Sequence, residues 1–237
     1  MPAWGAYIIA ALAGILLMIT FVLIMVMAFI YFERRGLGRF QIRLGPNRTG
    51  PFGLLQPVAD ALKVLLKEDI IPSKGDKLVF IIAPMIVFLP VLLIFGVIPV
   101  QGNAIFVDLN IGILYIFSIS GFAVIGAFMA GWASNNKYAL IGAVRSVSQM
   151  IAYEVPVVLS VLGVVLLSGS LSTVAIVEAQ KIPFILLQPL GFLLFFTASL
   201  AEINRAPFDL LEADSEIVAG YHIEYSGMKF AMFFLAE

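Results

Sequence analysis

Long apolar runs constrain this chain more than any other feature of its sequence. Residues 6–32 contain no charged side chain, and further apolar stretches follow at about residues 78–100, 111–132, 140–167 and 182–201. A helix rises about 1.5 Å per residue, so about 20 residues cross the hydrocarbon core of a bilayer. We therefore predict an all-α fold, a polytopic bundle of transmembrane helices that forms a single membrane domain over residues 1–237.

Composition supports a multi-pass integral membrane protein. Hydrophobic residues make up 62% of the chain and charged residues 12%, and the mean hydropathy is +1.06. A soluble domain carries about 25% charged residues. The first apolar run is too long for a signal peptide, and no basic residue precedes it. We expect a bacterial inner or plasma membrane, or the inner membrane of an organelle.

A sixth apolar stretch begins at residue 228 and reaches the last residue, 237. Ten residues make fewer than three helical turns, which is too short to cross a membrane. We therefore expect residues 228–237 to be the start of a further span, in a chain that is truncated at its C-terminus.

A polar insert between the first two apolar stretches contains an amphipathic pattern at about residues 54–68. Apolar side chains recur there at helical spacing, and polar side chains occupy the other faces; the apolar ones are Leu54, Leu55, Val58, Ala59, Leu62, Leu65 and Leu66. Pro57 suits the first turn of a helix. We predict an amphipathic helix that lies in the membrane interface, with an ordinary extramembrane helix packed on a partner as the alternative.

The basic residues define one orientation. With five spans and the N-terminus outside, all of the 14 lysines and arginines except Lys181 lie on the inner side. This distribution satisfies the positive-inside rule. Five of these residues fall in the Gly- and Pro-containing segment 33–51, a cationic loop that could bind anionic lipid, dock a soluble partner or line the mouth of a cavity.

Two ionisable side chains interrupt the stretch 140–167. Arg145 or Glu154 would cost about 2.5–3.5 kcal/mol at the centre of a bilayer. Nine positions separate them, so on one helix they face opposite directions and cannot pair. Gln149 and Tyr153 lie on the same face as Arg145. Arg145 is near the inner end of its span and could snorkel, whereas Glu154 lies deeper, and we expect a functional role for it.

Residues 202–237 combine acidic, aromatic and small apolar side chains. The acids are Glu202, Asp209, Glu212, Asp214, Glu216, Glu224 and Glu237. Crowded carboxylates in poorly hydrated surroundings bind protons more tightly and titrate together, which suits a proton relay. A solvated acidic loop is the alternative. Glu202 favours the relay because it follows the apolar stretch 182–201 directly.

Redox cofactors and metals are not expected on this chain. It has no cysteine, which excludes disulfides, thiolate-bound iron–sulfur clusters and cysteine zinc sites. His222 is its one histidine and cannot supply the paired axial ligands of a membrane cytochrome. We assign no catalytic or metal-ligating residue and expect no nucleic-acid partner.

Three segments carry a resemblance to a known family. They are ERRGLGRFQIRLGPNRTGPFGLLQPVADALKVLLKED at 33–69, RSVSQMIAYEV at 145–155, and LAEINRAPFDLLEADSEIVAGYHIEYSGMKFAMFFLAE at 200–237. In order and content they resemble the H-type subunit of NADH:quinone oxidoreductase, respiratory complex I, which corresponds to the mitochondrially encoded first subunit. That family continues for about two further helices.

The resemblance implies a membrane-arm subunit that forms the quinone-access tunnel and the start of a carboxylate path coupling quinone reduction to proton translocation. Residues implied for the tunnel are Arg34, Arg35, Arg48, Asp60 and Phe208. Residues implied for proton coupling are Glu154, Glu202, Asp209, Glu212, Glu216 and Glu224. The subunit would belong to a proton-translocating enzyme without being catalytic alone.

The resemblance also implies partners and cofactors. The chain would bind no cofactor itself, with quinone as substrate and the flavin and iron–sulfur clusters on partner subunits. Its partners would be the hydrophilic quinone-site subunits, the other membrane-arm subunits and membrane lipid. Two alternatives are the homologous subunit of a membrane-bound hydrogenase or ferredoxin-linked ion pump, and a stand-alone secondary transporter. The intact GPNRTGPFGLLQP segment argues against the first, and the lack of an internal repeat argues against the second.

Overall fold

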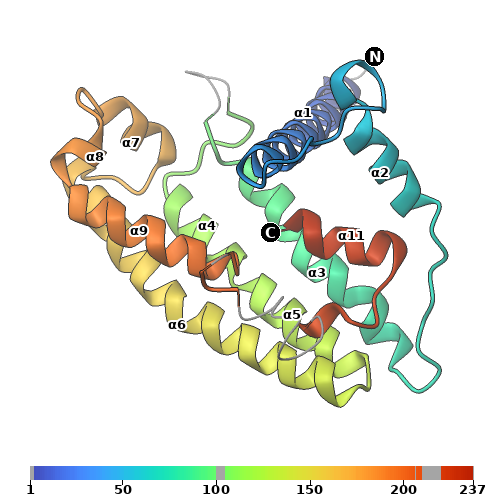
Figure 1. Cartoon of the computed structure of the whole chain (residues 1–237). Coiled ribbons are helices and arrows are strands. Elements are labelled where there is room, and N and C mark those ends of the chain that lie inside the picture. Colours follow the sequence, from blue (N-terminus) through green and yellow to red (C-terminus); the bar gives the residue numbers. More distant parts are fainter. Residues whose placement is uncertain (1–2, 100–104, 206, 210–219, 237) are drawn as a thin grey trace. The chain divides into compact units, whose positions relative to one another are not determined.

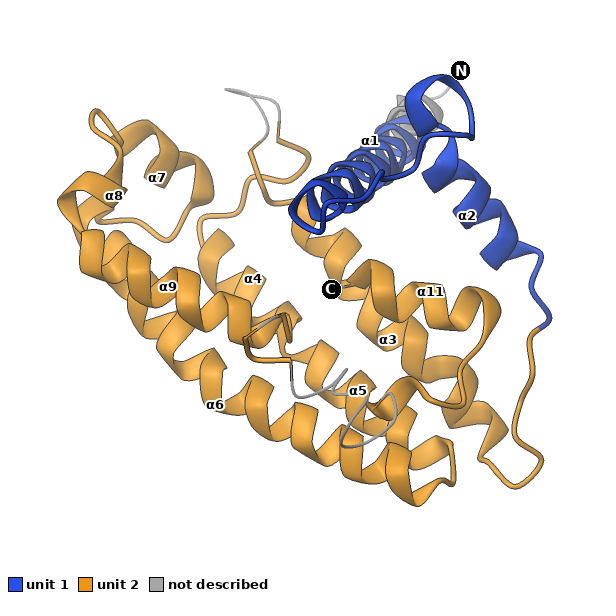
Figure 2. Cartoon of the chain, in the orientation of Figure 1, with its two compact units in different colours: residues 1–68 blue, residues 69–237 orange. Residues whose placement is uncertain are grey.

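Every regular element in the described part of the chain is a helix (Figure 1). The computed structural model describes residues 3–99, 105–205, 207–209 and 220–236. The chain divides into two units, Met1–Glu68 and Asp69–Glu237 (Figure 2). The helical content confirms the predicted fold class, and the expectation of a single membrane domain stays a prediction.

The first unit consists of α1 (Ala3–Phe40), the short 3₁₀ turn η1 (Pro51–Gly53) and α2 (Gln56–Leu65). The long helix α1 continues past the apolar run and through the first three arginines. The predicted amphipathic helix 54–68 is shorter than expected and covers only Gln56–Leu65. The turn before it has positive φ angles at Phe52 (56°) and Gly53 (78°), which cannot belong to a right-handed helix. A Cβ on Gly53 would lie 2.2 Å from the Pro46 carbonyl oxygen, so only glycine fits this turn.

The second unit begins with three apolar helical segments. They are α3 (Lys77–Phe95), the pair α4 (Gly112–Ser120) and α5 (Phe122–Ala133), which meet at Gly121, and α6 (Lys137–Ser168). Asp76 caps α3 by accepting bonds from two backbone amides, and Asn136 caps α6. The helix α3 ends at Phe95, short of the expected boundary at residue 100.

Shorter helices complete the second unit: α7 (Thr173–Ala179), α8 (Phe184–Leu187), α9 (Pro189–Glu202), η2 (Gly220–His222) and α11 (Gly227–Ala236). The expected span 182–201 is therefore divided at Gln188 between α8 and α9. Pro189 is the first residue of α9, where its missing N–H needs no partner.

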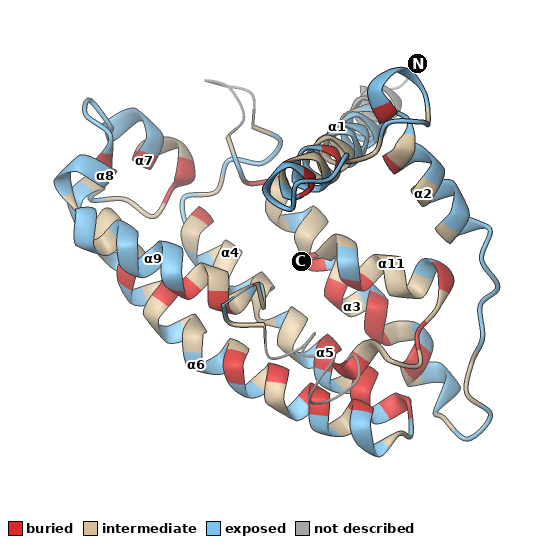
Figure 3. Ribbon diagram, viewed as in Figure 1, coloured by how far each residue is buried: buried red, intermediate tan, exposed pale blue. Residues whose placement is uncertain are grey.

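The core of the second unit lies where α3, α5 and α6 meet the segment around η2 and α11 (Figure 3). Small residues let these helices approach closely, as is common between membrane helices. The Phe80 ring of α3 stacks on Tyr225, with centroids 3.9 Å apart. The helix α9 packs along α6, which places the end of α9 beside the polar positions of α6.

Four helical segments of the described residues are long and apolar enough to cross a membrane: Ala11–Phe40, Lys77–Phe95, Gly112–Ala133 and Lys137–Ser168. The helices α9 and α11 are apolar but shorter. Large aliphatic and aromatic side chains remain exposed along these helices, as expected where lipid is the solvent.

Candidate functional site

In the first unit, a chain of polar contacts joins the end of α1 to α2. Arg34 forms an ion pair with Asp60, and the Gln56 amide donates to the other Asp60 oxygen at 3.0 Å. The Thr49 hydroxyl in turn donates to the Gln56 side-chain oxygen at 2.6 Å. The pair is partly exposed, so it contributes about 0–1 kcal/mol to stability. The ion pair therefore acts mainly by orienting the two side chains, because it holds the Arg34 guanidinium beside the Asp60 carboxylate.

A second set of contacts holds the turn that precedes α2. The Tyr31 hydroxyl donates to the Phe52 carbonyl at 3.0 Å, and Arg35 donates to the Tyr31 hydroxyl. The Arg35 guanidinium lies 6.0 Å from the centroid of the exposed Phe52 ring. Arg48 is exposed in the loop before η1. The structure thus brings Arg34 to Asp60 and Arg35 to an exposed aromatic ring.

In the second unit, Gln149 connects α6 to the end of α9 and to the segment after it. Its buried amide nitrogen donates to the backbone carbonyls of Ala201 at 2.6 Å and Phe208 at 2.8 Å. The Tyr153 ring, one turn further along α6, packs on the Phe208 ring with centroids 5.5 Å apart. The polar face predicted for α6 is therefore the face that positions Phe208.

Glu154 and Glu202 approach each other across the contact between α6 and α9. Both side chains are half-buried, and their carboxylates are close enough to interact electrostatically. The Glu154 carboxylate also lies against Gly121, where a Cβ would come within 3.6 Å of Oε1. Two half-buried carboxylates that repel each other disfavour double ionisation, which is a property that a proton-transfer pair needs.

The remaining predicted residues of this unit fall in different places. Asp209 is half-buried just after Phe208, and Glu212 and Glu216 lie outside the described residues. Arg145 is half-buried on α6, and Arg205 lies over the Phe234 ring at 5.9 Å.

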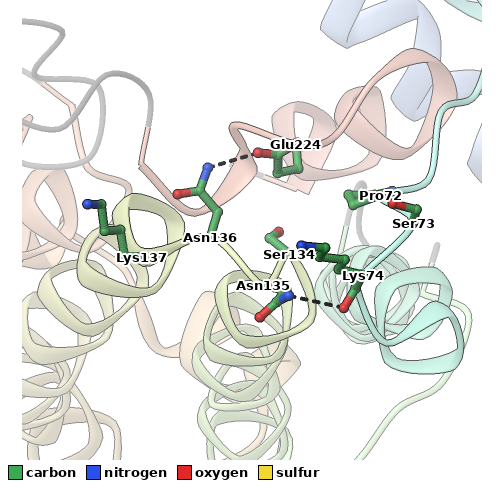
Figure 4. Close-up of a pocket in the computed structure, with 8 residues that line it drawn as sticks. All are labelled: Pro72, Ser73, Lys74, Ser134, Asn135, Asn136, Lys137 and Glu224. Carbon is green, nitrogen blue, oxygen red and sulfur yellow. Dashed lines mark hydrogen bonds between the residues drawn. The ribbon is translucent and has the colours of Figure 1, made fainter.

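Glu224 lies apart from the Gln149 contacts, at the N-terminal end of α6. The Asn136 amide donates to its carboxylate at 2.8 Å (Figure 4). Both line an open pocket of about 610 Å³, together with Pro72, Ser73, Lys74, Ser134, Asn135 and Lys137. The positive end of the α6 dipole favours a negative charge at this position. Most of the lining of the pocket comes from the loops that precede α3 and α6.

Burial changes the proton affinities of two groups that are close to Glu224 in the sequence. His222 packs edge to face against Tyr221 and Phe230, and burial lowers its pKa below 6.5. Burial raises the pKa of Tyr225 above its usual value, and its hydroxyl has no partner among the described residues. Both groups are therefore held neutral at physiological pH.

Sequence reasoning did not assign Gln56, Thr49 or Asn136 to a site. Gln56 is four residues before Asp60, a helical spacing that could have indicated the contact. Asn136 precedes a long apolar helix, as an N-cap does, but its second contact, with Glu224, depends on packing. In the described residues no group of three or more His, Cys, Asp or Glu side chains could hold a metal ion.

The long apolar helices, with half-buried carboxylates between two of them, define an integral membrane protein with several spans. Residues 13–237 match the family model described as NADH dehydrogenase. The chain is 61% identical over 226 residues to the H-type subunit of NADH-quinone oxidoreductase from Dehalococcoides mccartyi strain CBDB1, covering 95% of this chain. It is 53% identical over 237 residues to the corresponding protein from Brevibacillus brevis strain 47, covering 100% of this chain.

The chain therefore belongs to the NADH dehydrogenase family, among the H-type subunits of NADH-quinone oxidoreductases. This confirms the resemblance carried by the three sequence segments. The chain spans 64% of the length of the Dehalococcoides relative and 70% of the Brevibacillus relative.

Proposed function

We propose that this chain is a membrane-arm subunit of a proton-translocating NADH-quinone oxidoreductase. In this role it forms part of the quinone-access tunnel and the first part of a carboxylate path that couples quinone reduction to proton translocation. Its partners are the hydrophilic quinone-site subunits and the other membrane-arm subunits, with the flavin and the iron–sulfur clusters on partner chains. The family membership and the names of the relatives support this proposal.

The observation that carries the coupling role is the interaction between Glu154 and Glu202. Two carboxylates from two packed helices are half-buried and interact electrostatically. Because like charges repel, adding a proton to one carboxylate, or removing it, changes how strongly the other carboxylate binds a proton. A protonation change at one of the two residues is therefore passed on to the other. Asp209, Glu212, Glu216 and Glu224 would continue the path.

The tunnel role is supported by the first unit and by Phe208. Arg34 with Asp60, and Arg35 beside Phe52, place fixed guanidinium groups next to apolar side chains at the end of α1. Such a surface suits a quinone, which has an apolar tail and two carbonyl oxygens that accept hydrogen bonds. Arg48 would add a further cation to the tunnel mouth, and Phe208 an aromatic surface.

The coupling role is tested with Glu154→Gln, Glu202→Gln and the double variant in the assembled complex. Glutamine keeps the shape and polarity of the side chain but does not ionise. We expect each single variant to assemble normally and to lower quinone-dependent turnover and proton pumping by about tenfold. Because the two carboxylates interact, the double variant should lose less than the product of the two single losses.

Glu178→Gln is the matched control, because Glu178 is an exposed carboxylate on α7 of the same unit. Its turnover and pumping should equal those of the wild type. If Glu154→Gln and Glu202→Gln also pump at the wild-type rate with matched complex content, the coupling role has to be withdrawn.

A further inference from the structure

A second cavity adjoins the pocket that Glu224 lines, and Glu224 does not line it. Its volume is about 540 Å³, and it lies between the loop before α3 and the turn that joins α5 to α6. It shares Lys74 and Lys137 with the first pocket, in which Figure 4 labels them. Trp132 and Leu140 line only the second cavity. We call it the Trp132 pocket.

The walls of the Trp132 pocket are tied to each other. The Asn135 side-chain amide donates to the Lys74 carbonyl at 3.1 Å, which joins the turn between α5 and α6 to the loop before α3 (Figure 4). A Cβ on Gly75 would lie 2.6 Å from the Ala133 carbonyl oxygen, so this loop lies directly on the end of α5. A preformed site loses little conformational entropy when a ligand binds.

The cationic side chains of the pocket lack charged partners, whereas its carboxylate is already bonded. Lys74 and Lys137 are exposed, and neither forms an ion pair with another described residue. The Asp76 carboxylate accepts hydrogen bonds from two backbone amides of α3. The pocket therefore offers two ammonium groups to an anion, and a phosphate accepts hydrogen bonds from such groups.

The pocket lies at the level where a membrane has its lipid headgroups. The helix α3 begins at Lys77, α5 ends at Ala133 and α6 begins at Lys137, so three helical segments long enough to cross a membrane end beside it. Trp132 is 63% exposed. Tryptophan is enriched at the interface between membrane and water. Together with Leu140 it gives the pocket an apolar edge.

A phospholipid matches both halves of this pocket, whereas a small soluble anion matches only one. Its phosphate is complementary to the ammonium groups, and its acyl chains are apolar, as the edge formed by Trp132 and Leu140 is. Basic pockets between membrane helices on the inner side bind anionic head groups. The predicted orientation places Lys74 and Lys137 on that side.

We propose that the Trp132 pocket binds one anionic phospholipid. The ammonium groups of Lys74 and Lys137 hold its phosphate, and its acyl chains pass along Trp132 and Leu140. The bound lipid contacts both walls of the pocket and so joins the loop before α3 to the start of α6. This site goes beyond the proposed function, because it involves neither the quinone tunnel nor the carboxylate path.

Cross-linking with a photoactivatable phosphatidylglycerol tests the site. The protein is purified with its partner chains and reconstituted in phosphatidylcholine vesicles that contain a small fraction of the probe. We expect cross-links in this chain to concentrate in peptides from residues 72–78 and 131–140, after digestion with a protease that does not cut at lysine. The double variant Lys74→Gln, Lys137→Gln should lower this labelling by about tenfold or more, because each lysine near an anionic lipid contributes about fivefold to binding.

Lys181→Gln is the matched control, since Lys181 is an exposed lysine of the same unit that does not line the pocket. It should label as the wild type does. The double variant Lys74→Arg, Lys137→Arg keeps both charges and should also retain labelling. A photoactivatable phosphatidylcholine should label the pocket weakly in every variant, and excess inorganic phosphate should not displace phosphatidylglycerol, because it has no acyl chains.

Equal labelling of the pocket by phosphatidylcholine and phosphatidylglycerol would overturn the proposal, as would unchanged labelling in the double glutamine variant. Displacement by inorganic phosphate would assign the lysines to a soluble anion and would also overturn it. Loss of partner chains from the double glutamine variant, with wild-type labelling, would assign the lysines to a protein contact instead. The measurement does not use turnover, so failure of the proposed function would leave its result unchanged.

Discussion

The side-chain amide of Gln149 donates a 2.8 Å hydrogen bond to the backbone carbonyl of Phe208, 59 residues later in the sequence. A second bond from the same nitrogen reaches Ala201. One buried side chain of α6 therefore holds both the last turn of α9 and the segment that follows it. This places Phe208 against Tyr153 and Glu202 near Glu154.

Replacing Gln149 tests this arrangement. Gln149→Leu keeps the volume but removes the side-chain donor from both carbonyls. The Ala201 carbonyl keeps a bond from the Asn204 N–H at 3.3 Å, so the loss falls mainly on the Phe208 carbonyl and costs about 1–3 kcal/mol if that carbonyl stays buried. We expect a lower unfolding temperature for the complex in detergent, measured by thermal aggregation. Ser148→Ala is the control, because exposed Ser148 donates within its own helix, to the Val144 carbonyl, and its loss should change stability by less than about 0.5 kcal/mol. Equal unfolding temperatures for Gln149→Leu and wild type would contradict the holding role.

The Arg34–Asp60 pair should affect quinone use more than stability. Arg34→Gln and Asp60→Asn each remove the ion pair, which is partly exposed, so their coupling in a double-mutant cycle of stability should be about 0–1 kcal/mol. If the pair orients the tunnel mouth, each variant should raise the KM for quinone several-fold with a smaller change in kcat. Steady-state kinetics of the assembled complex measure both.

Lys63→Gln is the control for this pair, because Lys63 is exposed on the same helix, α2. Its KM should match that of the wild type. If Arg34→Gln and Asp60→Asn also leave the KM for quinone unchanged, the Arg34–Asp60 pair does not orient the tunnel mouth.

The close approach of α5 and α6 at Gly131 should be intolerant of any added side chain. A Cβ at Gly131 would lie 2.3 Å from the Ala143 Cβ and 2.8 Å from the Ala139 carbonyl oxygen. Gly131→Ala should therefore destabilise the chain by about 1–3 kcal/mol through overpacking. Gly36→Ala, on α1, meets nothing within 4 Å and should be neutral or stabilising by up to about 1 kcal/mol. Thermal unfolding that ranks the two variants in the opposite order would contradict the packing of α5 on α6.

His222 should make the fold sensitive to mild acid. Burial lowers its pKa from 6.5, so below about pH 6.5 the unfolded chain binds a proton that the folded chain does not. The stability of the wild type should therefore fall as the pH decreases from about 7.5 to 5. His222→Gln removes the one histidine of the chain, and its unfolding temperature should fall less over the same range. Parallel pH profiles would show that His222 is not buried neutral.

The sequence predicted the helical elements better than it predicted their ends. Charge-free runs specify helices because a lipid-exposed backbone must satisfy its own hydrogen bonds. Boundaries depend on the conformation of single residues: the expected helix 54–68 begins only at Gln56, after the turn at Phe52 and Gly53, and Gln188 separates α8 from α9 within the expected span 182–201. The pattern of apolar residues hardly changes at such breaks, so it does not predict where a helix ends.

The fold class, the membrane environment and the family can be predicted from the sequence, because they follow from long apolar runs and from three extended segments of specific residues. The sequence also gives Arg34, Asp60, Glu154 and Glu202 individually as candidate site residues. Their pairing depends on the packing of the helices: Arg34 contacts Asp60, and Glu154 interacts with Glu202. Residues this far apart in the sequence meet only because their helices pack together. Helix packing depends on small residues at the crossings, such as Gly131, and the charged residues themselves contribute little to it.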